Sequence, residues 1–451
     1  MNRRHLMVMA AASAALPVRA TPRRPPNFIV ILCDDLGYGD VGAFGGTLIR
    51  TPNIDRLAAE GVAMTDYYAP ANICTPSRAG LLTGRYPIRT GLGYEVIMAN
   101  DDRGLPASEI TIAAALKPTY ATALFGKWHL GHVAPFWPPT NHGFDKFFGI
   151  KYSHDMKPLA YYEDDADGTE LGPTPVDFRS LQQQFYAHAE LFIEAYKGAP
   201  FFVELALSAP HLPEYPHTPF EGLTKAGPYG DVGMEIDAIV GRLIAKLKAL
   251  GLDRDTLVIF TSDNGPWFEG SAGPLRDRKG GAGYDGGYRV PFIARQPGVI
   301  APARRLNSMI CGIDLMPTLC GMAGLGPPPG VTLDGRDISP LLRTGGPSPH
   351  DQILLFDNEA VVAVRTQKWK YVAATYYRGV KLPYSLMGLS ELYDLETDPG
   401  ENYSVAARHP KVAAEMHDRF NQAQAMFSPL KHKEIPVVFK QLHEMAAHLQ
   451  D

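Results

Sequence analysis

The chain enters its first buried element at Asn27-Phe28-Ile29-Val30-Ile31-Leu32-Cys33, an uninterrupted apolar run that ends at Asp34-Asp35. A run of this kind, without alternation of polar residues, is typical of a strand buried on both faces of a parallel sheet. Residues 201–207 and 256–261 repeat the pattern. Polar side chains follow again, with His211 after the first run and Asp263 and Asn264 after the second.

Helical patterns lie between these runs. Residues 54–58 form a short one, and residues 229–250 carry apolar side chains at helical spacing over a much longer stretch. Strands that alternate with helices indicate an α/β fold, in which helices sandwich a large and mostly parallel sheet. Ligands of such folds bind at the carboxyl ends of the strands. Any single Asp or Asn there is explained by a helix cap or a turn, but three such ends together predict one site.

The pattern of apolar and polar residues changes near residue 340. Short apolar runs at 353–356, 360–365, 369–372 and 391–395 are separated by polar turns, and a helical pattern covers about 410–427. Short runs with this spacing favour an antiparallel meander. We therefore expect a main domain over residues 21–340 and a smaller C-terminal α+β subdomain with an antiparallel sheet over residues 341–451.

Residues 1–20 have the pattern of a secretory signal peptide. Arg3 and Arg4 give a basic start, residues 6–16 are apolar, and Val18-Arg19-Ala20 offers small residues for cleavage. The arginine pair is also compatible with a twin-arginine signal. We expect an exported protein, periplasmic or secreted, with no membrane span after the leader is removed, because no other segment has eighteen uninterrupted apolar residues.

The composition excludes several classes of protein. Of 451 residues, 45% are hydrophobic and 20% are charged, which fits a globular chain and not a disordered or coiled-coil one. The formal net charge of −5 argues against nucleic acid as a partner.

One motif makes the chemistry specific. Residues 74–85 contain Cys74-x-Pro76-x-Arg78 followed by Leu-Leu-Thr-Gly-Arg. In this motif the chain resembles the type I, formylglycine-dependent sulfatases of the alkaline phosphatase superfamily, and within them the arylsulfatase A and N-acetylgalactosamine-6-sulfatase group. The resemblance runs over nearly the whole mature chain, in order, through Asp34-Asp35, Gly126–Gly131, Tyr152–Asp155, Pro210-His211, Ser262–Gly265, Lys279, Gly286–Pro291 and Leu392–Leu395.

The resemblance implies an alkaline-phosphatase-like fold and hydrolysis of O-sulfate monoesters, either aryl sulfates or sulfated sugars. It implies that Cys74 is oxidised to formylglycine (3-oxoalanine) by a formylglycine-generating enzyme, and that the hydrated aldehyde attacks sulfur. It places Arg78 on the formylglycine hydroxyl, His129 as the base for sulfate release, and His211 and Lys279 beside the leaving oxygen, one of them as general acid. Ser153, Lys127, His211 and Lys279 would contact the substrate.

The residues themselves point to the metal. Asp34, Asp35, Asp263 and Asn264 offer only oxygen ligands, which suit a hard divalent cation, calcium above all. No His–Cys set with zinc spacing accompanies them. Two capping carboxylates and a turn Asn are the alternative. The resemblance adds the converted Cys74 as a ligand of one Ca²⁺.

The chain departs from the family pattern at Asp285, where the family usually has Glu before Gly-Gly. A shorter carboxylate there would shift a supporting contact of Lys279. Two other functions stay open at this point. One is a phosphomonoester or phosphonate hydrolase of the same superfamily, and the other is a non-catalytic carbohydrate-binding relative that keeps Cys74 unmodified.

The four cysteines are Cys33, Cys74, Cys311 and Cys320. With Cys74 assigned to catalysis, three remain for at most one bridge. Residues 309–323 look helical except at Pro317, and nine residues along a helix span about 13 Å, too far for a disulfide between Cys311 and Cys320. We expect no disulfide.

Overall fold

The structure is a computed structural model, and it describes residues 24–377, 380–387 and 389–432. The predicted signal peptide, residues 1–20, lies outside the described residues. None of the helices within those residues is long and apolar enough to cross a membrane.

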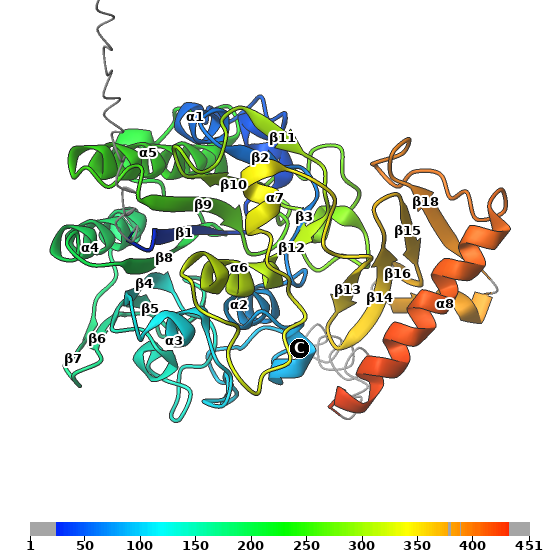
Figure 1. Cartoon of the computed structure of the whole chain (residues 1–451), viewed down its shortest axis with the longest axis horizontal. Coiled ribbons are helices and arrows are strands. Elements are labelled where there is room, and N and C mark those ends of the chain that lie inside the picture. Colours follow the sequence, from blue (N-terminus) through cyan, green and yellow to red (C-terminus); the bar gives the residue numbers. More distant parts are fainter. Residues whose placement is uncertain (1–23, 378–379, 388, 433–451) are drawn as a thin grey trace, which may run out of the picture.

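A ten-stranded sheet forms the centre of the molecule (Figure 1). Its middle strands β9, β1, β8, β4 and β5 are all parallel, while β10, β6 and β7 are antiparallel to their neighbours. In spatial order the strands are β11 (Arg304–Leu306), β2 (Val62–Met64), β10 (Phe292–Arg295), β9 (Thr256–Ser262), β1 (Asn27–Asp34), β8 (Phe201–Pro210), β4 (Ala121–Lys127), β5 (Lys146–Ile150), β6 (Tyr161–Asp165) and β7 (Glu170–Thr174).

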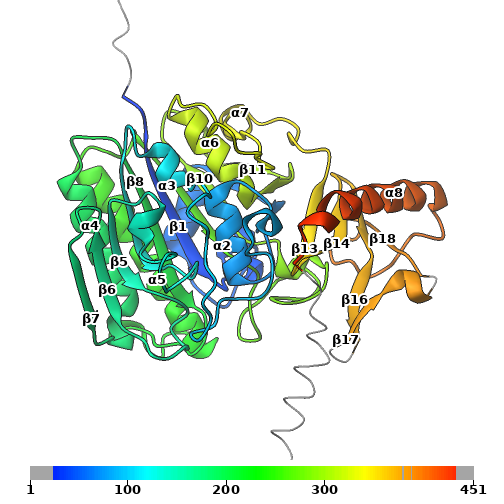
Figure 2. The same cartoon turned by 90° about the horizontal axis from the view of Figure 1, so that it is seen from below.

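Helices cover both faces of this sheet, which explains why its central strands read as continuous apolar runs. Ile29 and Ile31 of β1 pack in a core with α1, α4 and α5, whereas Val30 and Leu32 pack in a second core with α2, α3, α6 and α7. Figure 2 shows the two helix layers on either side of the strands. The helices are α1 (Pro52–Ala59), α2 (Cys74–Thr83), α3 (Ile112–Leu116), α4 (Leu181–Ala195), α5 (Gly227–Ala249), α6 (Leu315–Met322) and α7 (Ser339–Thr344).

The C-terminal part carries its own antiparallel sheet, drawn in yellow to orange beside the main sheet in Figure 1. Its strands are β13 (Ile353–Asp357), β14 (Ala360–Arg365), β15 (Trp369–Val372) and β18 (Glu391–Asp394), with α8 (Pro410–Phe427) packed against them. Two small pairs complete the strands: β3 (Tyr67–Tyr68) with β12 (Ile310–Cys311), and β16 (Ala374–Tyr377) with β17 (Val380–Pro383). The predicted fold class is confirmed, while the boundary after residue 340, which falls within α7, remains a prediction.

One local prediction was wrong. The segment 309–323 is not one helix, because β12 pairs with β3 before α6 begins at Leu315. Tertiary pairing with a buried strand has overridden the local helical pattern. All four cysteines are free and buried.

Candidate active site

Four neighbouring strands of the main sheet end at one edge, and polar side chains stand at every end. The site therefore follows from the parallel arrangement of β9, β1, β8 and β4. In strand order these residues are Asp263 and Asn264 after β9, Asp34 at the end of β1 with Asp35 next, His211 after β8, and Lys127 at the end of β4.

Asp35 has a strained backbone. Its φ of +67° lies in the left-handed region, which residues other than glycine rarely adopt. Two hydrogen bonds hold this turn: Asp35 N donates to Asp263 Oδ1 at 3.3 Å, and the next amide, Leu36 N, donates to the hydroxyl of Ser262 at 2.9 Å. Strain of this kind persists where the surroundings over-determine it, which is common at functional sites.

Cys74 is the first residue of α2, and the helix directs its N-terminus towards the strand ends. The Cys74 thiol lies 3.3 Å from Asp34 Oδ1 and 3.9 Å from Asp35 Oδ1, with 1% of the residue exposed. Burial and the Asp34 carboxylate raise the pKa of this thiol well above its ordinary value. The thiol therefore stays protonated, which makes the unmodified side chain a poor nucleophile.

Three cations surround the carboxylates. Arg78 Nε donates to Asp263 Oδ2 at 2.9 Å, Lys127 Nζ lies 2.7 Å from Asp34 Oδ2, and Lys279 Nζ lies 2.7 Å from Asp35 Oδ2. All six side chains are buried or nearly so, at 12% exposure or less. The three cations are fixed at this edge of the sheet, where they could contact a compact anion.

The carboxylates differ in their proton affinity. Burial opposes ionisation of Asp34, but Lys127, His211 and Arg78 hold its pKa well below the usual range. Burial raises the pKa of Asp263 to about 6, although Arg78 opposes the shift. The Asp35 carboxylate raises the pKa of Lys279 well above its ordinary value despite burial. Lys279 therefore stays charged.

His211 reaches the same cluster from the end of β8. Its Nδ1 lies 2.5 Å from Leu212 O, so the ring donates that hydrogen to the carbonyl, and its Nε2 lies 3.7 Å from Asp35 Oδ2. The neighbouring ring of His154 stands nearly perpendicular to it, with centroids 5.7 Å apart. His154 follows Ser153, so this contact brings the Ser153 segment to His211.

His129 and Ser153 are buried close to this edge of the sheet. His129 Nε2 lies 2.9 Å from Ile97 O and must carry the ring hydrogen, which leaves the lone pair on Nδ1. Burial, Lys127 and Arg78 lower the pKa of His129 well below its ordinary value. Within the described part of the chain neither His129 Nδ1 nor Ser153 Oγ has a hydrogen-bond partner, so both atoms are free to meet a ligand.

The donor set fits a divalent cation. One ligand atom from each of Asp34, Asp35, Cys74 and Asp263 lies within 4.8 Å of all the others. Asn264 Nδ2 donates to Asp35 Oδ1 at 2.7 Å, but Asn264 Oδ1 is buried without a partner among the described residues. An orphaned buried amide oxygen is costly, and a bound cation would satisfy it.

Several residues at the site were missed by sequence reasoning. Thr75 Oγ1 donates to His129 O at 3.0 Å and the Ser77 hydroxyl donates to Asp263 O. Tyr229 OH lies 2.6 Å from Asp40 Oδ2, to which it donates, and 3.2 Å from Asp35 O. Thr75 and Ser77 lie within the Cys74 motif, so that motif was their signal. Tyr229 begins the long amphipathic pattern of α5, which gives no hint of this contact.

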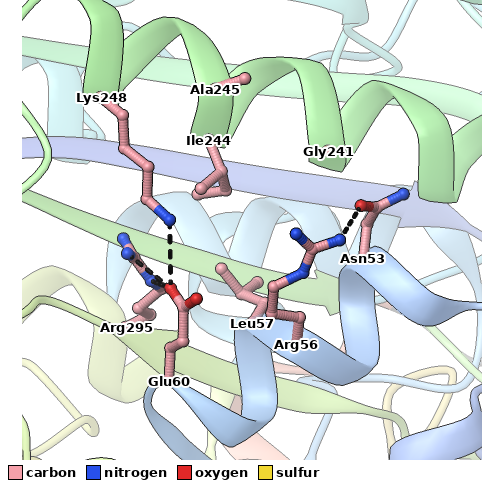
Figure 3. A pocket seen from close by; sticks show the side chains of 9 residues that line it. All are labelled: Asn53, Arg56, Leu57, Glu60, Gly241, Ile244, Ala245, Lys248 and Arg295. Carbon is pink, nitrogen blue, oxygen red and sulfur yellow. Dashed lines mark hydrogen bonds and ion pairs between the residues drawn. The ribbon is translucent and has the colours of Figure 1, made fainter.

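A separate cavity of about 120 Å³ lies between α1 and α5 (Figure 3). It contains none of the predicted site residues. Arg295 at its edge ends β10 and pairs with Val258 near the start of β9, so the cavity lies at the opposite end of the sheet from Asp263. Glu60 lies 2.7 Å from Arg295 and 3.7 Å from Lys248, and Arg56 donates to Asn53 Oδ1 at 2.7 Å.

The sequence of this chain matches two families of known proteins. The family described as "Sulfatase" covers residues 26–325, and the family "N-sulphoglucosamine sulphohydrolase, C-terminal" covers residues 281–426. Arylsulfatase A of Homo sapiens is 37% identical over 473 residues, covering 95% of this chain and 91% of its own length. N-acetylgalactosamine-6-sulfatase of Canis lupus familiaris is 36% identical over 393 residues, covering 81% and 74%.

Solved structures agree on the architecture. The crystal structure of PsFucS1 sulfatase from Pseudoalteromonas sp. superposes with a TM-score of 0.82 at 27% identity, covering 91% of this chain and 92% of that one. The similarity therefore includes both the main sheet and the C-terminal sheet.

Proposed function

We propose a mechanism on the premise that this chain belongs to the sulfatase family and hydrolyses sulfuric esters. The proposal is that Cys74 is converted to formylglycine, that Asp34, Asp35, Asp263, Asn264 and the converted Cys74 hold one Ca²⁺, and that the products are an alcohol and inorganic sulfate. The observation that carries it is the buried Cys74 side chain, 3.3 Å from Asp34 Oδ1 at the start of α2.

Formylglycine, once hydrated, would supply one hydroxyl that attacks sulfur and a second whose deprotonation expels sulfate. In the folded chain burial and Asp34 raise the pKa of the Cys74 thiol, so an unmodified Cys74 would be a poor nucleophile, which favours a modified residue at this position. Ca²⁺ would neutralise charge on the sulfonyl oxygens and lower the pKa of the attacking hydroxyl.

The remaining work falls to the side chains of this chain. Arg78 and Lys127 carry positive charge at the edge where the sulfonyl oxygens would sit, and Ser153 has a free hydroxyl to donate to them. Arg78 and Lys127 are fixed by Asp263 and Asp34 before substrate arrives, which is the condition for electrostatic stabilisation of a transition state.

Proton transfer is assigned to two histidines. His129 presents an unprotonated Nδ1, because its Nε2 hydrogen is directed at Ile97 O, and its lowered pKa keeps it neutral and able to accept the proton for sulfate release. His211 and Lys279 both approach Asp35 Oδ2 and would flank the leaving oxygen, one of them as its acid.

The maturation and location are part of the same proposal. Cys74 is 1% exposed, so a formylglycine-generating enzyme could reach it only before folding is complete. We assign residues 1–20 to a signal peptide for export to the periplasm or medium. N-terminal sequencing of the exported protein should begin just after Ala20, and a retained leader would contradict this assignment.

Mass spectrometry of the tryptic peptide Leu57–Arg78, from protein made in its native host, tests the central step. We expect a peptide that thiol alkylation does not modify and that an aldehyde-reactive hydrazide does. An intact, alkylatable thiol would overturn the formylglycine mechanism. Turnover of an aryl phosphate exceeding that of the matching aryl sulfate would overturn the assignment of sulfate as the favoured substrate.

A further inference from the structure

Lys279 reaches the active site from a loop, residues 276–287, that links the two parts of the molecule. Its tip is held on the Cys74 side: Gly280 N donates to Asn72 O at 3.0 Å, and Asn72 Nδ2 donates to Gly281 O at 2.6 Å. These contacts locate the backbone around the tip. They leave open what fixes the base of the loop, where Arg276 and Asp285 meet.

The base of the loop is closed tightly. Gly286 N donates to Arg276 O at 2.7 Å, and a Cβ on Gly286 would lie only 2.0 Å from Asp277 O. Asp277 also has a φ of +68°, in the left-handed region. A loop with a strained residue and no room at its base needs neighbours that hold it in one conformation.

Both ends of this base are bonded to one residue of the C-terminal part, Glu401. Arg276 Nη1 donates to the Glu401 backbone carbonyl at 2.9 Å, while Asp285 N donates to Glu401 Oε2 at 2.7 Å. Glu401 is fully buried and itself has a φ of +54°. The backbone and the side chain of Glu401 therefore accept hydrogen bonds from opposite ends of the 276–287 loop.

The C-terminal sheet supports Glu401 in this position. Lys370 of β15 lies 2.7 Å from Glu401 Oε1 and 2.6 Å from Asp285 Oδ1, and all three side chains are inaccessible to solvent. Tyr393 of β18 accepts a second hydrogen bond from Arg276 Nη1 at 2.9 Å. The carboxylate of Asp285 thus pairs with Lys370, whereas Lys279 pairs with Asp35.

We propose that Glu401 is a positioning residue for catalysis, which clamps Arg276 and Asp285 so that the loop presents Lys279 to Asp35. The C-terminal subdomain is then required for chemistry at a site to which it contributes no reacting group. The inference rests on the role given to Lys279 under Proposed function, and the experiments separate the two.

Hydrogen exchange tests the clamp without reference to activity. In Glu401→Ala, the amides of residues 277–283 should exchange faster by about tenfold or more, because the base of the loop opens more often. Glu396→Ala is the matched control, since Glu396 is an exposed acid in the same region that pairs with Lys368. Unchanged exchange in Glu401→Ala would overturn the clamp.

A double-mutant cycle tests the catalytic consequence. Glu401→Ala should lower kcat about 10- to 100-fold on an alkyl sulfate, the order expected for misplacement of a catalytic group. In a Lys279→Ala background the same substitution should change kcat by less than about twofold. Effects of the two substitutions that multiply in the double variant would overturn the positioning role.

Tyr393→Phe is the milder second variant, because it removes only one acceptor of Arg276. It should shift exchange and kcat in the same direction as Glu401→Ala but by less, and no shift in either would count against the clamp. If Lys279→Ala alone leaves kcat unchanged, the role of Lys279 fails, and the exchange measurement still decides whether Glu401 holds the loop.

Discussion

Cys74 Sγ lies 3.3 Å from Asp34 Oδ1, although the two residues are 40 positions apart in the sequence. Asp34 is fixed by the end of β1 and Cys74 by the start of α2, so the sheet and the helix layer above it determine the distance together. The proposed nucleophile and the proposed metal ligands are thus positioned by the same two elements. Changes to the metal ligands should affect stability and turnover together.

Removing the unpaired amide oxygen of Asn264 should weaken the binding of Ca²⁺. We expect Ca²⁺ to raise the melting temperature of the enzyme, with about 2.7 kcal/mol of stabilisation at a concentration 100 times Kd. Asn264→Ala should lose much of this calcium-dependent shift, because Asn264 Oδ1 is a buried acceptor without a protein partner in the described structure. Thermal scans across a Ca²⁺ titration measure it, with the exposed Asn402→Ala as control. Equal shifts in both variants would reject Asn264 as a ligand.

His211 should matter most for esters with poor leaving groups. If it is the general acid, His211→Ala should slow an alkyl or sugar sulfate by about 10²- to 10⁴-fold and 4-nitrophenyl sulfate much less, since the nitrophenolate leaves unaided. The control is His217→Ala, a histidine of the same loop that bonds to Arg179 O. Values of kcat/KM across a series of leaving groups provide the test. A uniform loss along the series would assign the acid role elsewhere, with Lys279 the remaining candidate.

His129 should act after the alcohol has left. His129 has a φ of +58°, which Asn tolerates better than most residues, so His129→Asn removes the Nδ1 base with little added strain. Stopped-flow measurement on 4-nitrophenyl sulfate should show a burst of about one phenol per enzyme, followed by turnover slowed about 10²-fold or more. Wild type should show no burst. A slow variant that also lacks a burst would place His129 in the first step instead.

The strand ends explain how much of this site could be predicted. Asp34, Asp263 and His211 each follow a continuous apolar run, and parallel strands bring such ends to one edge whatever lies between them. These strand ends can be predicted from local patterns alone, without knowledge of the loop conformations. The predicted helix over residues 309–323 was wrong for the opposite reason, because Ile310 pairs with Tyr67, and this long-range contact leaves no local pattern.

Other features of the site depend on contacts that no local pattern encodes. The short distance from His129 Nε2 to Ile97 O shows that Nδ1 is the free nitrogen. Glu401 bonds to both Arg276 and Asp285, which lie more than 100 positions away in the sequence. The shortened Asp285 was expected to disturb Lys279. In the structure the Asp285 carboxylate instead contacts Lys370, Tyr68 and Arg289. The contact with Lys370 depends on the packing of the C-terminal sheet, which no local pattern encodes.

Glu204 is a buried acid for which the reaction has no use. It lies in the middle of β8, where it pairs with Val30 of β1 and Leu124 of β4, on the face that also carries Phe202 and Ala206. It is 2% exposed, and its Oε2 has no hydrogen-bond partner among the described residues. Burial raises the pKa of Glu204 to about 7, with Arg78 opposing the shift.

The sign of the resulting pH dependence follows from proton binding. Below about pH 4.5 the carboxyl is protonated in both folded and unfolded chains, so it has no effect. Between there and its folded pKa of about 7 the folded chain binds more protons, so stability falls as pH rises. Above that pKa the full cost of a buried charge applies, on the order of 3 kcal/mol from the size of the shift.

Glu204→Gln mimics the protonated carboxyl at every pH and should abolish this loss. Relative to wild type, the variant should differ little in melting temperature near about pH 5 and be clearly more stable near about pH 8, because only the wild type must then ionise a group enclosed by the sheet. Thermal scans of both proteins at the two pH values measure the difference, and the exposed Glu396→Gln serves as control for a carboxylate in water. A gain in stability that is the same at both pH values would show that the amide merely packs better, and that Glu204 is not the group that titrates.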